Sequence, residues 1–139
     1  MTQPPVSPES LQQALADLFA PWVQALDLQL ATVGPGEVTL RLPHSAQLSR
    51  VGGMLCGQAM MAAADTAMVL ALISHFGAFR PCSTVQLSSS FLKPLSGQDA
   101  LVTARVLRAG KSMAFGEIDL RGAEDGQSVF RASTTYALL

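Results

Sequence analysis

The residues of this chain that could do chemistry lie in or beside one apolar stretch, Met54 to Phe76. The stretch holds a single carboxylate, Asp65, which is the only acidic residue between Glu37 and Asp99. An ionised carboxylate in apolar surroundings is costly unless it is paired or solvated. While it stays ionised, it is a stronger base there than in water. Asp65 is therefore a candidate general base or nucleophile; the alternative is a structural carboxylate bonded to Ser, Thr or Arg.

A second candidate group is the backbone at the start of the same stretch, around Gly57. The first turn of a helix offers free N–H groups and a positive dipole end, which suit a developing oxyanion. Gly57 has no side chain to block close approach. Cys56 and Asp65 are nine residues apart, so they lie on roughly opposite sides of a helix and about 13 Å apart along it. One chain cannot bring its own Asp65 to its own Gly57, and a site that uses both needs two chains.

The element that must position these groups is a long helix, expected over Met54 to Phe76 and apolar nearly all round. Such a helix belongs in the centre of a fold or in a membrane. The uncharged runs on either side of Asp65, Val51 to Ala64 and Thr66 to Phe79, are 14 residues each. A membrane span needs roughly 18. We therefore expect a buried core helix and no membrane partner.

Alternating apolar and polar residues predict strands before and after this helix. A hairpin is expected from residues 28–33 and 37–42, around Gly34-Pro35-Gly36. Four strands in meander spacing are expected after Gly77, at about residues 82–92, 99–109, 112–122 and 128–138. An antiparallel sheet wrapped around one helix is the economical α+β arrangement. The uncovered side of the helix should meet a second copy of the chain, so we expect a homodimer.

The N-terminal segment, residues 1–27, predicts a short helical lead-in. Residues 1–8 are expected to be frayed, because Pro4, Pro5 and Pro8 resist regular structure. Ser7 is a plausible N-cap with Pro8 at the first helical position, and Pro21 should end or kink the helix. Trp22 is expected in the core.

Length and composition set the remaining limits. The 139 residues suit one domain, 1–139, with its core in residues 28–139. The net charge of -1 gives no electrostatic case for nucleic acid or an anionic membrane as partner. The two cysteines, Cys56 and Cys82, form neither a metal-ligand pattern nor a disulfide framework. We expect a reduced, cytoplasmic setting, no signal peptide, no metal and no cofactor.

Three motifs, taken together, carry a resemblance to a known family. Its pattern at the helix start is Asn, two residues, Gly, two residues, His-Gly-Gly, six residues, Asp. The same frame is occupied here by Arg50, Gly53, Cys56, Gly57, Gln58 and Asp65. Residues 84–94 fit the family's third strand with its Phe-x-x-Pro ending, and residues 104–112 fit the strand that leads to its Gly-Lys turn. Over residues 28–138 the chain resembles the hotdog-fold acyl-CoA thioesterases of the PaaI-like group, in the 4-hydroxybenzoyl-CoA thioesterase superfamily.

The resemblance implies an α+β hotdog fold, a homodimer that often pairs into a homotetramer, and hydrolysis of an acyl-CoA thioester at the dimer interface. It implies that Asp65 acts as nucleophile or general base. It also implies that the Gly57 N–H binds the thioester carbonyl and that Thr84 orients the carboxylate or the water.

Three positions depart from the family pattern, since Arg50, Cys56 and Gln58 replace its Asn, His and second Gly. Cys cannot copy the hydrogen bonds of imidazole, and Arg50 could pair with Asp65 of a second copy. We keep these three as substrate-binding candidates, with Lys111 and Ser112 at the Gly-Lys turn. Lys93, Arg108 and Lys111 either contact CoA phosphates or are simply solvated.

Two other functions stay open. The replaced positions favour a non-catalytic binder of acyl ligands on the same scaffold. A hotdog dehydratase or hydratase is less favoured, because such enzymes pair an Asp with a His and no His lies near Asp65 in the sequence.

Overall fold

The N-terminal helix begins where the sequence predicts. The computed structural model describes residues 6–139, so most of the segment expected to be frayed lies outside the described residues. Helix α1 spans Pro8–Asp17, and the Ser7 hydroxyl accepts a hydrogen bond from the Ser10 N–H at 3.1 Å. The Ser10 hydroxyl in turn accepts one from the Ser7 N–H, which completes a reciprocal cap.

The end of this segment differs from the prediction. Helix α1 ends at Asp17, and Pro21 instead begins a second short helix, α2, Pro21–Gln24. Proline suits that first helical position because its missing N–H would have no helical partner there. Trp22 is 64% exposed, so the expectation that it lies in the core is wrong.

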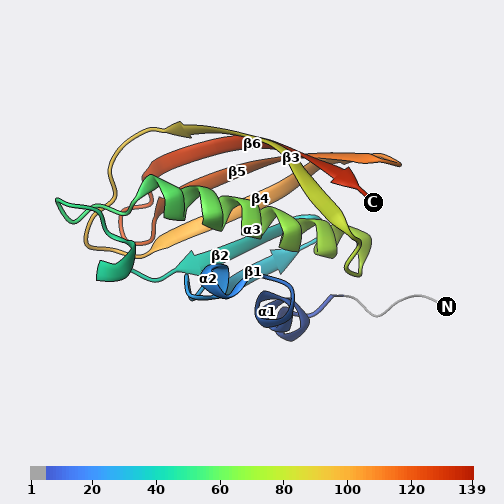
Figure 1. The fold of residues 1–139 in the computed structure, drawn as a ribbon, viewed down its shortest axis with the longest axis horizontal. Coiled ribbons are helices and arrows are strands. Elements are labelled where there is room, and N and C mark those ends of the chain that lie inside the picture. Colours follow the sequence, from blue (N-terminus) through green and yellow to red (C-terminus); the bar gives the residue numbers. More distant parts are fainter. Residues whose placement is uncertain (1–5) are drawn as a thin grey trace.

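Six strands form one antiparallel sheet. Their bounds are β1 Gln29–Gly34, β2 Glu37–Leu42, β3 Cys82–Phe91, β4 Ala100–Ala109, β5 Met113–Gly122 and β6 Ser128–Leu138. The order across the sheet is β1-β2-β4-β5-β6-β3, as Figure 1 shows. The predicted strands and the α+β hotdog fold are confirmed.

The expected meander holds only for β4, β5 and β6. Strand β3 does not pair with β4, which follows it in the chain; it pairs with β6 at the far edge, and β2 takes the place beside β4. The reason is helix α3, Gly57–Phe76, which lies along one face of the sheet and separates β2 from β3 in the chain (Figure 1). A helix in that connection lets the chain leave one side of the sheet and return at the other.

Helix α3 begins at Gly57, three residues later than predicted. The preceding residues are extended and tied to other loops: Met54 bridges to Ser96, and the Leu55 N–H donates to the Leu95 carbonyl. At the other end Gly77 takes the left-handed conformation, with φ 81°, and closes the helix through the Ile73 carbonyl.

The core forms where α3 packs on the sheet. Five of the buried residues of α3 are alanines, and strand β5 places Gly116 under Met68, where an added Cβ would collide with the Met68 methyl. Helix α3 is long and apolar enough to cross a membrane, but 61% of its most apolar window is buried inside the fold. That burial is the pattern of a core helix.

Candidate functional site

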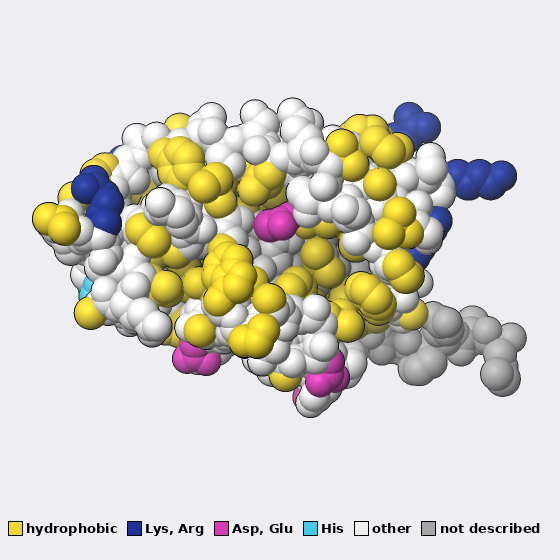
Figure 2. Space-filling model, viewed as in Figure 1, with side chains coloured by type: hydrophobic (Ala, Val, Ile, Leu, Met, Phe, Trp, Pro, Cys, Tyr) yellow, Lys and Arg dark blue, Asp and Glu magenta, His cyan; other side chains and the backbone are white. Residues whose placement is uncertain are grey.

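Asp65 lies half-buried on α3, where its side chain reaches strands β3 and β6. Hydrophobic side chains are spread over much of the face that carries α3, and one acidic group lies near the middle of that face (Figure 2). Asp65 is the only acidic residue of the helix. The carboxylate therefore has access to a ligand while most of its surroundings stay apolar.

Two hydroxyl groups hold the Asp65 side chain. Thr84 Oγ1 donates to Asp65 Oδ1 at 2.9 Å, and the Tyr136 hydroxyl contacts the same oxygen. The Tyr136 hydroxyl also lies 2.9 Å from the Asp65 backbone carbonyl. Thr84 and Tyr136 are cross-strand partners on β3 and β6, so the pairing of these strands brings both hydroxyls to the helix. The predicted association of Thr84 with Asp65 is present.

Tyr136 is the residue that the sequence reasoning missed. It is the only tyrosine of the chain, and it lies on the inward face of β6, 1% exposed. A buried tyrosine hydroxyl almost always needs a partner. A single tyrosine in a strand and a single carboxylate on the core helix could have suggested that the two side chains are partners. Recognising this contact also requires the strand pairing that places Tyr136 opposite Thr84.

Cys82 lies near this cluster, and its surroundings disfavour the thiolate form. Burial, and then the negative charge of Asp65, raises the pKa of the Cys82 thiol. A thiol in this state carries little of the thiolate that reacts. Burial, and then the charge of Asp65, also raises the pKa of the Tyr136 phenol far above its ordinary value, so Tyr136 remains a proton donor.

The start of α3 forms a second cluster. Gly57 is the first helical residue, and Cys56 precedes it in an extended conformation without capping the helix through its side chain. Within residues 6–139, nothing accepts a hydrogen bond from the Gly57 N–H. This free donor at a positive helix end can bind an oxyanion.

Two pockets flank the Gly57 turn. One, of about 340 Å³, is lined by Gly57 with Arg50 and Lys93 as its cations and with apolar walls that include Phe91. The other, of about 270 Å³, has an uncharged lining that includes Trp22, Cys56 and Gln58. Arg50, Cys56 and Gln58 thus all lie at this turn, and in the described chain the Arg50 guanidinium hydrogen-bonds only to the Val51 carbonyl and the Met54 sulfur.

Lys111 and Ser112 lie elsewhere, in the turn between β4 and β5. Their backbone carbonyls accept hydrogen bonds from Arg80 and Leu138. Arg80, which the sequence reasoning did not single out, also lies over the Phe76 ring at 5.4 Å. Within one chain the predicted site residues therefore form three separate groups: Asp65 with Thr84, the residues at the Gly57 turn, and Lys111 with Ser112. A hydrogen bond between side chains of predicted site residues joins only Thr84 and Asp65 in the described chain.

The Asp65 cluster and the free Gly57 N–H are eight residues apart on one helix, or about 12 Å. This geometry can be compared with known proteins. The model of the thioesterase superfamily matches residues 52–129, a segment that contains Gly57, Asp65 and Thr84.

The chain belongs to the thioesterase superfamily.

This thioesterase superfamily member is similar in sequence to curated proteins and in fold to solved structures. The chain is 25% identical to human acyl-coenzyme A thioesterase 13 over 138 residues, covering 93% of this chain and 97% of the relative. Zebrafish thioesterase superfamily member 2 superposes with a TM-score of 0.86 at 22% identity, covering 96% and 99% of the two chains. The PaaI protein from the Escherichia coli phenylacetic acid degradation operon gives 0.82 at 18% identity, covering 95% and 93%.

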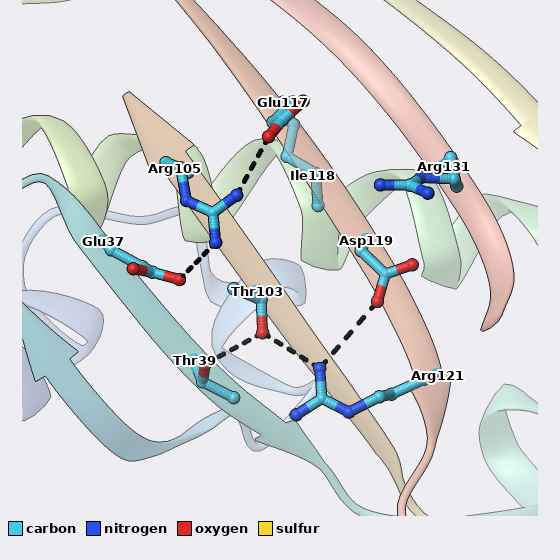
Figure 3. A pocket seen from close by; sticks show the side chains of 9 residues that line it. All are labelled: Glu37, Thr39, Thr103, Arg105, Glu117, Ile118, Asp119, Arg121 and Arg131. Atoms are coloured by element: carbon cyan, nitrogen blue, oxygen red, sulfur yellow. Dashed lines mark hydrogen bonds and ion pairs between the residues drawn. The ribbon is translucent and has the colours of Figure 1, made fainter. Parts of the chain in front are cut away.

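The outer face of the hotdog sheet carries a pocket of a different kind. It measures about 380 Å³ and lies on the side away from α3, as Figure 3 shows. Arg105 bridges Glu37 and Glu117 at 2.9 and 3.0 Å. Because these carboxylates are already paired with guanidinium groups, the pocket offers no free base, and its exposed pairs add little stability.

No group of three His, Cys, Asp or Glu side chains in the described part of this thioesterase superfamily member is arranged to hold a metal ion.

Proposed function

We propose that the chain hydrolyses an acyl-CoA thioester at a site built from two copies of itself. The observation that carries the proposal is the half-buried Asp65 carboxylate, held on α3 by two hydroxyls, in a chain of the thioesterase superfamily. Asp65 of one copy faces Gly57 of the other, since about 12 Å of helix separates them within one chain.

The edge of the sheet supports a dimer. Among residues 6–139, strand β3 has β6 as its one neighbour, so its other edge is unpaired there. Val85 and Phe91 on this strand are largely exposed. An exposed, partly apolar edge strand invites pairing with another chain. A second copy placed there would also cover the apolar side of α3 and bring two sites together; two such dimers would make the tetramer.

The reaction follows from these groups. As a general base, Asp65 takes a proton from water while the water oxygen attacks the thioester carbon. As a nucleophile, Asp65 attacks that carbon itself and water then hydrolyses the anhydride. In both cases the Gly57 N–H of the second copy binds the oxyanion, the carbon–sulfur bond breaks, and the CoA thiolate leaves and is protonated.

The CoA phosphates would lie at the β4–β5 turn. Lys111 and Ser112 occupy this turn, and Arg80 is joined to it through the Lys111 carbonyl. Arg108 is on the adjacent end of β4, and none of these three cations is in an ion pair in the described chain. Free cations at one end of the molecule suit an anionic carrier. We expect a cytoplasmic setting, where acyl-CoA is the available thioester.

The alternative is a non-catalytic binder of acyl ligands. It is favoured by the replaced positions Arg50, Cys56 and Gln58, because the Cys56 side chain makes no hydrogen bond at the helix start. A hydratase remains less favoured, since neither His44 nor His75 hydrogen-bonds to Asp65 among the described residues.

The first experiment measures thiol release from short, aromatic and long acyl-CoAs with wild type and Asp65→Ala. Hydrolysis by wild type that is lost in Asp65→Ala supports the proposal. Hydrolysis that survives Asp65→Ala contradicts the role of Asp65. Ligand binding without hydrolysis of any thioester favours the binder.

A second experiment tests the shared site. Asp65→Asn and Gly57→Pro chains are each expected to be inactive, and they are unfolded and refolded together. A mixed dimer has one intact site and one doubly altered site, so about a quarter of wild-type activity should return. Activity no higher than the sum of the two separate variants would show that the site is not shared.

A further inference from the structure

The two hydrogen bonds to Asp65 are unequally placed on its carboxylate. Thr84 Oγ1 and the Tyr136 hydroxyl both contact Oδ1. Oδ2 accepts no hydrogen bond from residues 6–139. The carboxylate is thus fixed through one oxygen, and the other is free to meet water or a thioester.

Tyr136 is built to act as a permanent donor to this oxygen. It is 1% exposed, and its strand position opposite Thr84 aims the phenol at α3. Burial and the Asp65 charge raise the pKa of the phenol. The hydroxyl therefore keeps its proton at any pH near neutrality and cannot itself serve as the base.

A second buried hydroxyl on β6, that of Thr134, has a different kind of partner from the Tyr136 hydroxyl. Thr134, two residues earlier and also facing inward, is 3% exposed and donates to the Gln86 backbone carbonyl at 2.7 Å. That hydroxyl is satisfied by the sheet alone. Tyr136 could be satisfied likewise by the Asp65 backbone carbonyl at 2.9 Å, yet its hydroxyl also reaches the carboxylate.

We infer that Tyr136 is a positioning residue for the hydrolysis, holding Asp65 Oδ1 together with Thr84 so that Oδ2 is the oxygen that reacts. The inference rests on the proposed function. A carboxylate with one anchored oxygen has its side-chain rotation restricted, and alignment of reacting groups within about 1 Å is worth up to a hundredfold in rate.

The kinetic test compares Tyr136→Phe, which removes only the hydroxyl, with Thr134→Val, which removes a buried hydroxyl that does not touch Asp65. We expect Tyr136→Phe to lower kcat at least about tenfold, the loss that corresponds to one hydrogen bond to a charged group. KM should stay within about twofold, because Tyr136 acts on the carboxylate and not on substrate binding. Thr134→Val should keep both constants within about twofold of wild type.

A spectroscopic test does not depend on the Phe variant folding. Because Tyr136 is the only tyrosine, growth on 3-fluorotyrosine labels this site alone. Its ¹⁹F resonance should shift in Asp65→Asn and stay unchanged in Asp99→Asn, which alters a distant carboxylate.

The outcomes separate this inference from the function on which it rests. Wild type that hydrolyses no thioester overturns the proposed function and this role with it. A different result separates the two claims. If wild type is active, Asp65→Asn is inactive and Tyr136→Phe has an unchanged kcat, the proposed function stands and the positioning role of Tyr136 is wrong. The positioning role is also wrong if the chemical shift of the ¹⁹F resonance is the same in Asp65→Asn as in wild type.

Discussion

Replacing Gly57 by proline tests the backbone donor on its own. Gly57 is the first residue of α3, where proline is favoured and where its N–H has no helical partner. The preceding residue, Cys56, has φ -73° and ψ 148°, an extended conformation that proline requires before it. We therefore expect Gly57→Pro to fold with its unfolding temperature near that of wild type, while it loses the N–H that would bind the oxyanion.

The size of the effect follows from the geometry. An added Cβ at Gly57 would lie 3.1 Å from Phe91 Cε1, and Phe91 is 51% exposed, so its ring can move aside. Gly57→Ala adds this Cβ but keeps the N–H. Loss of one oxyanion donor lowers kcat by about a hundredfold to a thousandfold, or roughly 2.7–4 kcal/mol. That factor is expected between the Pro and Ala variants.

The assay is thiol release from the acyl-CoA that wild type hydrolyses fastest, with circular dichroism to confirm that both variants fold. A small loss in Gly57→Ala measures the Phe91 contact. If Gly57→Pro retained the kcat of Gly57→Ala, the Gly57 N–H would not stabilise the transition state, and the argument from the helix start would be refuted.

Three further predictions concern stability, each measured by urea unfolding. Gly116→Ala should destabilise the fold by about 1–3 kcal/mol, because its Cβ would collide with the Met68 methyl and lie 2.9 Å from the Arg105 carbonyl oxygen. Ser7→Ala should lower the free energy of unfolding by about 1 kcal/mol through loss of the α1 cap; no change would mean that the cap does not stabilise the fold. The Asp99 pKa is lowered, chiefly by the His44 backbone N–H and further by Arg41. The ionised Asp99 carboxylate therefore stabilises the folded state above the ordinary pKa of Asp, and this contribution is lost as the pH falls through the lowered value. Asp99→Asn should therefore narrow the difference in stability between neutral pH and about pH 3, by less than about 1 kcal/mol because the pair is exposed.

Local patterns in the sequence were enough for most of the elements. The alternation of Val38, Leu40 and Leu42 with polar neighbours identified β2, and the Ser7-Pro8 pair located the start of α1. The start of α3 was misplaced because Met54 and Leu55 are as apolar as the helix itself. Bridges to other loops, which hydrophobicity does not reveal, hold these two residues extended.

Strand order was beyond the reach of local patterns. Spacing alone favoured β3 beside β4, since short connections usually join neighbouring strands. After α3 the chain enters the sheet at its far edge, so β3 pairs with β6. The same pairing explains why Tyr136 was missed, because its partner Thr84 is distant in the sequence and adjacent only in the sheet.

The sequence by itself determined the helix with its single carboxylate and the glycine at its start, because helix periodicity fixes their separation. Tertiary structure decided what holds that carboxylate. Pairing of β3 with β6 brings Thr84 and Tyr136 to one oxygen of Asp65 and leaves the other without a partner in the described chain. Side-chain orientation depends on contacts between strands far apart in sequence, and those contacts exist only once the sheet has closed around the helix.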